Sequence, residues 1–143
     1  MPTLDAFLDR YGGRTRFWLE IKASGVEAAL VDAVQRRQLM DAVQFTSFNF
    51  QSLERVRAVT STANIGFLTR EMQPDTIDRC LGIQTAMISL HHSNLTHVVM
   101  QQIRDRGMDV RTWGIDTKEV LRKALALGVY GLTLNWPDWA TSS

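Results

Sequence analysis

A glutamate and a lysine stand two residues apart in an otherwise apolar run, RFWLEIK at residues 16–22. Charged side chains are costly to bury unless they are paired or used. Because alternate side chains of a β-strand share a face, Glu20 and Lys22 are expected on the same face as Trp18. The opposite face is entirely apolar and consists of Phe17, Leu19 and Ile21. The spacing leaves two interpretations open: the charges line a functional site, or they form an internal ion pair that serves packing alone.

Six short apolar runs each predict a β-strand that is buried on both sides or nearly so. They are residues 16–22, 42–48, 64–69, 86–91, 109–115 and 129–135. Amphipathic stretches between them predict helices. These are residues 26–40, 52–59, 75–81, 94–107 and 117–128, and another helix over residues 2–13 precedes the first strand.

Residues that favour helix ends support these boundaries. The expected first helix starts at Thr3 or Pro2 and ends at Gly12. The later signals are Asn94 or Ser93 and Asp116 or Thr117 as N-caps, Pro74 in a first turn, and Gly107 and Gly128 at helix ends.

Strand and helix alternate with a repeat of roughly 20 to 26 residues, which predicts parallel strands joined by right-handed crossovers. An open doubly wound sheet and a closed (β/α) barrel both fit this alternation. No glycine-rich nucleotide or phosphate loop follows any of the strands. In a barrel, the face that carries Glu20 and Lys22 points inward, and both residues lie near the C-terminal mouth, where barrel enzymes carry their active sites.

Composition limits the classes of partner. The 143 residues have a formal net charge of +1, so nucleic acid is not expected as a partner, and no apolar run is long enough for a membrane span. The one cysteine, Cys80, is expected to be a buried helical residue, and its isolation suits a reducing compartment such as the cytoplasm. The length predicts a single domain over residues 1–143.

Five segments, in order, resemble the glycerophosphodiester phosphodiesterase family, whose members are TIM barrels. PTLDAFLD (2–9) resembles the family's Pro-Thr-Leu helix, WLEIK (18–22) its metal-binding strand, and TSFNFQSLERV (46–56) its Ser-Phe strand end and following helix. RDRGMDVRTWGID (104–116) and GVYGLTLNWP (128–137) resemble its last two strands. The resemblance therefore implies a TIM barrel, here an incomplete one with about six parallel strands and alternating helices.

The resemblance also implies roles for individual residues. Glu20 would be a ligand of a divalent cation, Mg²⁺ or Ca²⁺, and Lys22 would lie beside the phosphate of the bound diester. Trp113 would form a wall of the substrate pocket, and Ser47 would shape the mouth of the barrel. Members of the family hydrolyse glycerophosphodiesters, such as glycerophosphocholine, to glycerol 3-phosphate and an alcohol.

Several family motifs are not present in these 143 residues. They are a His-Arg-Gly, a Glu-x-Asp with two metal ligands, and a His-Asp, which together carry both catalytic histidines. In addition, Tyr130 and Asn135 stand where the family usually has aspartate. We therefore assign no catalytic residue, expect any cation to be weakly bound, and expect the chain alone to be inactive or weakly active. Whether Met1 is the native start is left open.

Other readings of the sequence remain. The open edges of a six-stranded partial barrel need a cover, so we expect a homo-oligomer, and the alternative function is a non-catalytic oligomeric scaffold or binding protein. His91 and His92 are expected to be solvated or capping, although one of them could reach the mouth of an unrelated (β/α) enzyme. Asp116 and Asp138 follow strands and could offer a further carboxylate to a cation.

Overall fold

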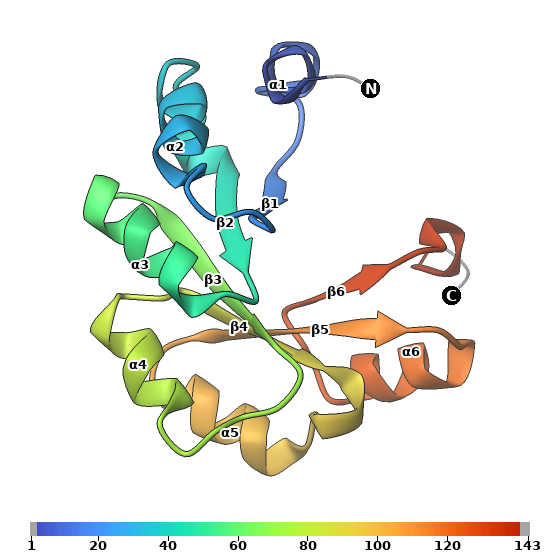
Figure 1. Cartoon of the computed structure of the whole chain (residues 1–143). Coiled ribbons are helices and arrows are strands. Elements are labelled where there is room, and N and C mark those ends of the chain that lie inside the picture. The colour runs from blue at the N-terminus through green and yellow to red at the C-terminus, as the bar shows by residue number, and fades with distance from the viewer. Residues whose placement is uncertain (1–2, 141–143) are drawn as a thin grey trace. The chain divides into compact units, whose positions relative to one another are not determined.

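The structure is a computed structural model that describes residues 3–140. Its contacts divide the chain into two compact units, residues 1–67 with 83–85 and residues 68–82 with 86–143. Each unit alternates strands with helices (Figure 1). The two units are described separately below, and the single domain expected over residues 1–143 stays a prediction.

The first unit contains three parallel strands in the order β1-β2-β3. The strands are β1 (Phe17–Glu20), β2 (Val43–Ser47) and the first residues of β3 (Asn64–Thr69). The helices are α1 (Leu4–Tyr11), α2 (Glu27–Gln35), a short 3₁₀ helix η1 (Met40–Ala42) and α3 (Phe50–Val59).

The core of the first unit explains the alternation in β1. Phe17 and Ile21 are buried in one apolar cluster with residues from α1, α2, β2, α3 and β3, among them Leu8, Val31, Val34, Phe45, Leu53 and Ile65. The next residues along β1 point the other way, so Trp18 is 44% exposed and Glu20 and Lys22 are also exposed. The two predicted faces of this strand are therefore confirmed.

The second unit contains three more parallel strands, in the order β4-β5-β6. They are β4 (Met87–His91), β5 (Asp109–Ile115) and β6 (Gly131–Leu134). The helices are α4 (Thr76–Gly82), α5 (His97–Arg104) and α6 (Lys118–Ala126), with short 3₁₀ helices η2 (His92–Asn94) and η3 (Pro137–Ala140). Fully buried side chains from β4, α5 and β5 form much of its interior, including Ile88, Leu90, Met100, Ile103 and Val110.

The predicted elements are all present, with shifted ends. Thr3 and Thr117 cap α1 and α6 with their side chains, and Gly12 follows α1 as expected. The predicted cap of α5 is wrong: Asn94 belongs to η2, and the hydroxyl of Thr96 accepts the capping hydrogen bond from Val99 instead. The alternative start at Pro2 lies outside the described residues.

None of the helices in residues 3–140 has both the length and the apolar composition that a membrane span needs. Cys80 is fully buried in α4, as predicted.

Candidate functional site

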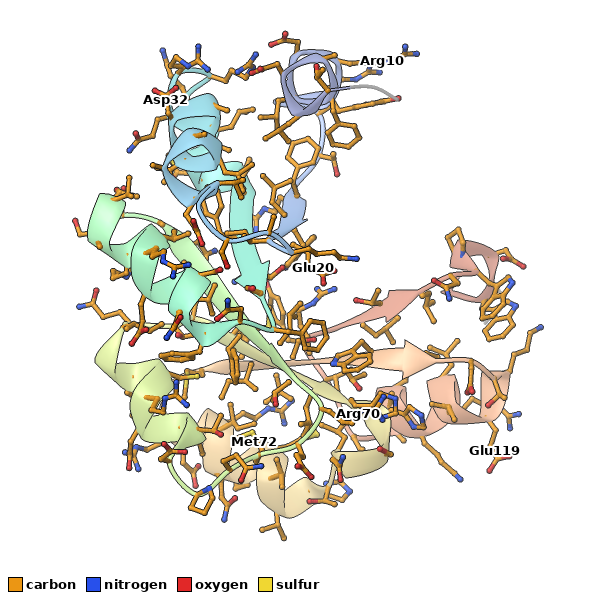
Figure 2. The ribbon with its side chains drawn as sticks, in the orientation of Figure 1. Arg10, Glu20, Asp32, Arg70, Met72 and Glu119 are labelled. Carbon is orange, nitrogen blue, oxygen red and sulfur yellow. The ribbon has the colours of Figure 1, made fainter. Side chains whose placement is uncertain are left out.

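Glu20 and Lys22 form an exposed ion pair at the C-terminal end of β1. The Lys22 ammonium nitrogen lies 3.7 Å from a Glu20 carboxylate oxygen, and the side chains are 78% and 37% exposed, respectively. Glu20 is the last residue of the strand (Figure 2). The pair is therefore not an internal packing contact, and both charged groups can be reached by a ligand from solvent.

The neighbouring strands carry matched polar residues on the face of Glu20. Trp18 lies in register with Gln44, and Gln44 with Asn64. The Trp18 indole N–H donates to the Gln44 side-chain oxygen at 2.6 Å, and the Gln44 amide nitrogen donates to Asn64 at 2.9 Å. Toward the strand ends the next row consists of Glu20, Thr46 and Gly66. Glu20 thus lies beside the buried Thr46, and Gly66 follows on the far side of Thr46.

Ser47 fixes the backbone between Glu20 and Lys22. Its buried hydroxyl donates to the carbonyl oxygen of Ile21 at 2.7 Å and accepts from the backbone N–H of Asn49 at 3.0 Å. The Ile21 N–H in turn donates to the Thr46 carbonyl at 2.7 Å. These bonds hold the end of β1 against β2, and the role of Ser47 in shaping the barrel mouth stays a prediction.

Glu27 anchors the loop that follows Lys22. Its carboxylate accepts from the Gly25 N–H at 2.8 Å and lies 3.3 Å from the Arg55 guanidinium, while the residue is only 2% exposed. Burial by itself would raise the pKa of Glu27, but hydrogen bonds from its own backbone, Ser52, Arg55 and Gly25 outweigh burial and lower it. Glu27 therefore stays ionised and ties the loop to α3.

Trp113 is held in the second unit by residues at the ends of two other strands. Its indole N–H donates to the Thr69 carbonyl at 3.2 Å. The Arg70 guanidinium carbon lies 5.6 Å from the centre of the indole ring, and the His91 ring makes a nearly perpendicular contact at 4.6 Å. The half-buried indole thus lies within a cluster that also carries positive charge.

His91 has a structural role next to Trp113. Its Nδ1 accepts from the backbone N–H of Ser93 at 3.3 Å and lies 2.8 Å from the Ser93 hydroxyl. His91 is therefore the N-cap of η2, which agrees with the predicted capping role. Its ring lies 4.5 Å from that of His92. Burial lowers the pKa of His91, and the positive charges of His92 and Arg70 lower it further, against an opposing effect of Asp116.

A β-bulge interrupts β5 at Trp113 and Gly114. The register of β5 with β6 shifts between Thr112 and Ile115, so the two residues Trp113 and Gly114 of β5 stand opposite a single residue of β6. Gly114 has φ +79°, and a Cβ added there would lie 2.5 Å from Nε2 of His91. Only glycine satisfies both the backbone conformation and the close approach of the imidazole.

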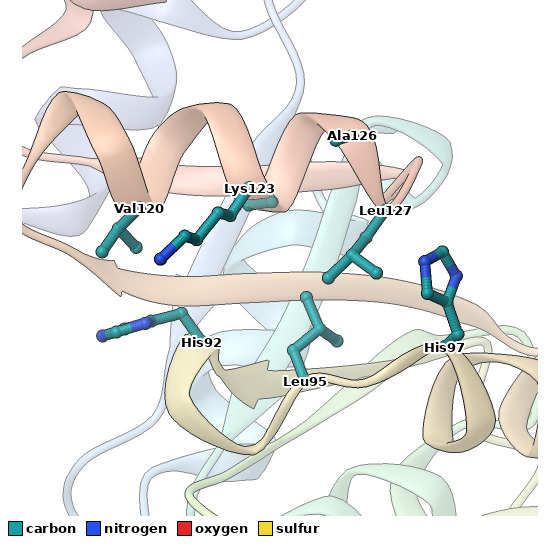
Figure 3. A pocket seen from close by; sticks show the side chains of 8 residues that line it. His92, Leu95, His97, Val120, Lys123, Ala126 and Leu127 are labelled. Carbon is teal, nitrogen blue, oxygen red and sulfur yellow. The ribbon is translucent and has the colours of Figure 1, made fainter.

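A pocket of about 460 Å³ lies elsewhere in the second unit (Figure 3). It is formed by η2, the start of α5 and one side of α6, and its lining is His92, Leu95, His97, Val120, Lys123, Ala124, Ala126 and Leu127. None of Glu20, Lys22 and Trp113 lines it. The size suits a small molecule, but the site predicted from the sequence is not this pocket.

The family of the chain is shown by comparing its sequence with those of known proteins. The sequence profile of the glycerophosphoryl diester phosphodiesterase family matches residues 17–139, which is most of the 143-residue chain. The chain belongs to the glycerophosphoryl diester phosphodiesterase family. The YhdW protein of Bacillus subtilis is 24% identical over 97% of this chain and 60% of its own length. A glycerophosphodiester phosphodiesterase of the same organism is 24% identical over 96% of this chain and 52% of its own length.

Solved structures show that this member of the phosphodiesterase family has the expected fold. A Galdieria sulphuraria protein superposes with a TM-score of 0.89 at 20% identity, over 98% of this chain and 62% of that one. An Oleispira antarctica phosphodiesterase, solved with the product sn-glycerol 3-phosphate, gives a TM-score of 0.86 at 21% identity, over 99% of this chain and 60% of that one. The fold class is confirmed as an incomplete TIM barrel of six parallel strands that alternate with helices.

The chain therefore spans between half and two thirds of the length of these relatives. Within residues 3–140, no three His, Cys, Asp or Glu side chains gather where they could hold a metal ion. Glu20 fits as one exposed oxygen ligand, because Mg²⁺ is often bound through one or two carboxylates with several waters. Its neighbour Lys22 already offsets part of its charge, so a cation held here would be largely hydrated.

The structure brings Glu20 and Lys22 together in the first unit, and it places Trp113 in the second. Arg70 and Glu27 were not predicted from the sequence. Arg70 directly follows a correctly predicted strand, so the rule that singled out Glu20, a charged residue at a strand end, would also have found Arg70. Glu27 gave no comparable signal, because its burial depends on hydrogen bonds made by the loop and by α3.

Proposed function

We propose that this chain contributes to a metal-dependent site that binds and hydrolyses glycerophosphodiesters. The observation that carries the proposal is the exposed pair of Glu20 and Lys22 at the end of β1, on the face opposite the helices, in a chain of this family. The relative solved with sn-glycerol 3-phosphate supports the choice of ligand. Trp113 is proposed to pack against the substrate.

Each side chain has a distinct task in this proposal. Glu20 supplies one oxygen ligand to Mg²⁺ or Ca²⁺. Lys22 is long and mostly exposed, so its ammonium group can leave Glu20 and contact a phosphate oxygen when the diester binds. The cation, when bound, offsets negative charge on the phosphate and orients it. Ser47 keeps the two charged residues in register by holding Ile21 between them.

We expect the 143-residue chain on its own to hydrolyse the diester slowly or not at all. The resemblance assigns proton transfer to two histidines in motifs that these residues do not contain, and general acid and base catalysis typically contributes about 10² to 10⁴ in rate. Binding is therefore the more direct test of the site than turnover.

The test is a calorimetric titration of the chain with sn-glycerol 3-phosphate, with and without Mg²⁺ or Ca²⁺. Lys22→Gln is expected to weaken binding about tenfold, since a charge-assisted hydrogen bond is lost, and Glu20→Gln is expected to remove the effect of the cation. Exposed residues of the same types, Lys118→Gln and Glu54→Gln, serve as controls. Binding that is absent, or equal in all variants, contradicts the proposal.

A second candidate function is a non-catalytic homo-oligomeric scaffold or binding protein. Among the described strands β1 pairs only with β2, and large side chains beside it are exposed: Phe7 at 39%, Tyr11 at 37% and Trp18 at 44%. An edge strand flanked by apolar groups is a surface that a second copy can cover. Sedimentation at micromolar concentration tests this function. A wild-type oligomer that becomes monomeric in the Phe7→Glu variant favours the scaffold, and a monomeric wild type excludes it.

We further propose a cytoplasmic location. The support is the single, fully buried thiol of Cys80, which suits a reducing compartment. Fractionation of cells that produce the tagged chain tests the location, and recovery outside the cytoplasm contradicts it.

A further inference from the structure

The pocket shown in Figure 3 has walls that are tied together at their ends. The guanidinium of Arg104, the last residue of α5, donates to the carbonyl of Gly128, which follows α6. The hydroxyls of Thr96 and Thr117 cap the starts of the same two helices. The pocket of about 460 Å³ therefore lies between anchored elements of the second unit, and its size suits a small molecule.

The middle of the pocket is apolar. Leu95 and Ala124 are buried, and Val120 and Leu127 are half-buried. Figure 3 shows the Leu95 side chain pointing toward Leu127 on the opposite wall. An alkyl chain between these two side chains would be removed from water, which favours binding. The pocket therefore suits a ligand with an alkyl portion.

Ammonium and imidazole groups lie at the ends of this apolar surface. Lys123 and His92 lie at one end of the pocket, and His97 lies at the other (Figure 3). Within the described part of the chain, no aspartate or glutamate lines the pocket. The charge of the lining is thus positive, which favours an anionic ligand over a cationic one.

The ion pair that Lys123 makes does not prevent it from binding a ligand. Its ammonium nitrogen lies 2.7 Å from a Glu119 carboxylate oxygen one helical turn away, and the two side chains are 71% and 68% exposed. An exposed pair of this kind contributes little to stability, because water solvates both charges. The Lys123 ammonium can therefore exchange Glu119 for the anionic group of a ligand, and Glu119 acts as a weak competitor.

We propose that this pocket binds a carboxylate with a medium-length alkyl chain, such as octanoate. The carboxylate contacts the Lys123 ammonium and the His92 imidazole, and the chain lies between Leu95 and Leu127. One ammonium and one imidazole match the two oxygens of a carboxylate, whereas a phosphate group carries a third oxygen that these two groups leave without a donor. The inference concerns the second unit alone and does not depend on the proposed function.

The test is an NMR titration of the whole chain with octanoate, followed at the backbone amide signals of Leu95 and Leu127. Lys123→Gln is expected to weaken binding about tenfold, because a charge-assisted contact is lost. Glu119→Gln is expected to strengthen binding about twofold, because the competing carboxylate is removed. Lys118→Gln, exposed on the same helix and outside the pocket lining, is the control and is expected to leave the affinity unchanged.

Three further probes test the two parts of the ligand. Butyrate has the same head group and a shorter chain, so it is expected to bind about tenfold more weakly than octanoate. Octylamine has the same chain length and a positive head group, which Lys123 repels, so it is also expected to bind about tenfold more weakly. Octyl phosphate compares the two kinds of anionic head group on one chain.

The outcomes that contradict the proposal are distinct. Amide signals of Leu95 and Leu127 that do not shift at millimolar octanoate overturn it. An affinity that is the same for octanoate and octylamine, or that survives Lys123→Gln, overturns it as well. Tighter binding of octyl phosphate than of octanoate overturns the choice of a carboxylate. The glycerol 3-phosphate titration reports on Lys22 in the other unit, so its result is independent of these outcomes.

Discussion

The hydroxyl of Ser47 donates a 2.7 Å hydrogen bond to the carbonyl of Ile21, the residue between Glu20 and Lys22. The same oxygen accepts from Asn49, which caps α3. One buried side chain therefore joins the end of β1, the end of β2 and the start of a helix. The geometry of the candidate site depends on a residue that bears no charge.

Ser47→Ala should destabilise the chain by about 1 to 3 kcal/mol, because the Ile21 carbonyl and the Asn49 N–H lose a buried partner. Urea denaturation measures the change, and Ser61→Ala, at an exposed turn, is the control. Glycerol 3-phosphate binding should weaken in parallel, since Lys22 loses its fixed backbone. A variant as stable as the wild type would show that Ser47 is not an anchor.

Glu27→Gln should also destabilise the chain by about 1 to 3 kcal/mol near neutral pH, because a buried carboxylate that accepts several hydrogen bonds is replaced by a neutral amide. The pKa of Glu27 is lowered from 4.5, so its contribution is present above that pH and is lost as the pH falls through the lowered value. The difference between wild type and variant should therefore shrink in acid. Glu119→Gln, in an exposed pair with Lys123, should change little at any pH.

Gly114→Ala should destabilise the chain more than Gly107→Ala. Both glycines have φ +79°, but a Cβ at Gly107 meets nothing within 4 Å, whereas one at Gly114 meets the His91 ring. The unfavourable backbone conformation alone should cost about 1 to 2 kcal/mol, and the clash should add about 1 to 3 kcal/mol at Gly114. If thermal or urea unfolding shows that the two variants lose the same unfolding free energy, the His91 ring moves aside without cost.

The unfolding free energy should fall as the pH drops below 6.5. The pKa of His91 is lowered from 6.5 by burial and by the charges of His92 and Arg70, so the unfolded chain binds this proton more readily. The slope should not exceed about 1.4 kcal/mol per pH unit for this one group, and His91→Gln should remove it. His97→Gln, in α5, is the control.

Arg70→Gln provides an independent check of the cluster around His91. Removing the positive charge should move the pKa of His91 upward, toward its ordinary value. NMR titration of the imidazole protons measures it. An unchanged pKa would indicate that Arg70 points away from His91 in solution.

The sequence was sufficient for the elements but not for the tertiary contacts. The six strands follow from runs of apolar residues, and the two faces of β1 follow from the strict alternation at Phe17 to Lys22. The cap of α5 was missed because Ser93 and Asn94 are good caps locally, whereas η2 takes them up and leaves Thr96 to start the helix.

Contacts between residues that lie far apart in the sequence could not be predicted from local sequence patterns. The contact between Arg70 and Trp113 joins the residue after β3 to a residue of β5, and the burial of Glu27 depends on Arg55 of another helix. Local spacing carries no information on such pairs. Trp113, by contrast, was found through its resemblance to a family motif, and its function stays a prediction.

The hydrogen-bonded row of Trp18, Gln44 and Asn64 has a consequence for how the first unit assembles. Gln44 presents its oxygen to one neighbour and its nitrogen to the other, so the row has a direction as well as a position. A one-residue shift of β1 or β3 against β2 would set Val43 or Phe45 opposite the polar residue of the shifted strand and would reverse the two faces of that strand relative to β2. The row therefore favours the observed register of both strand pairs, and Gln44 is the residue that the two pairs share.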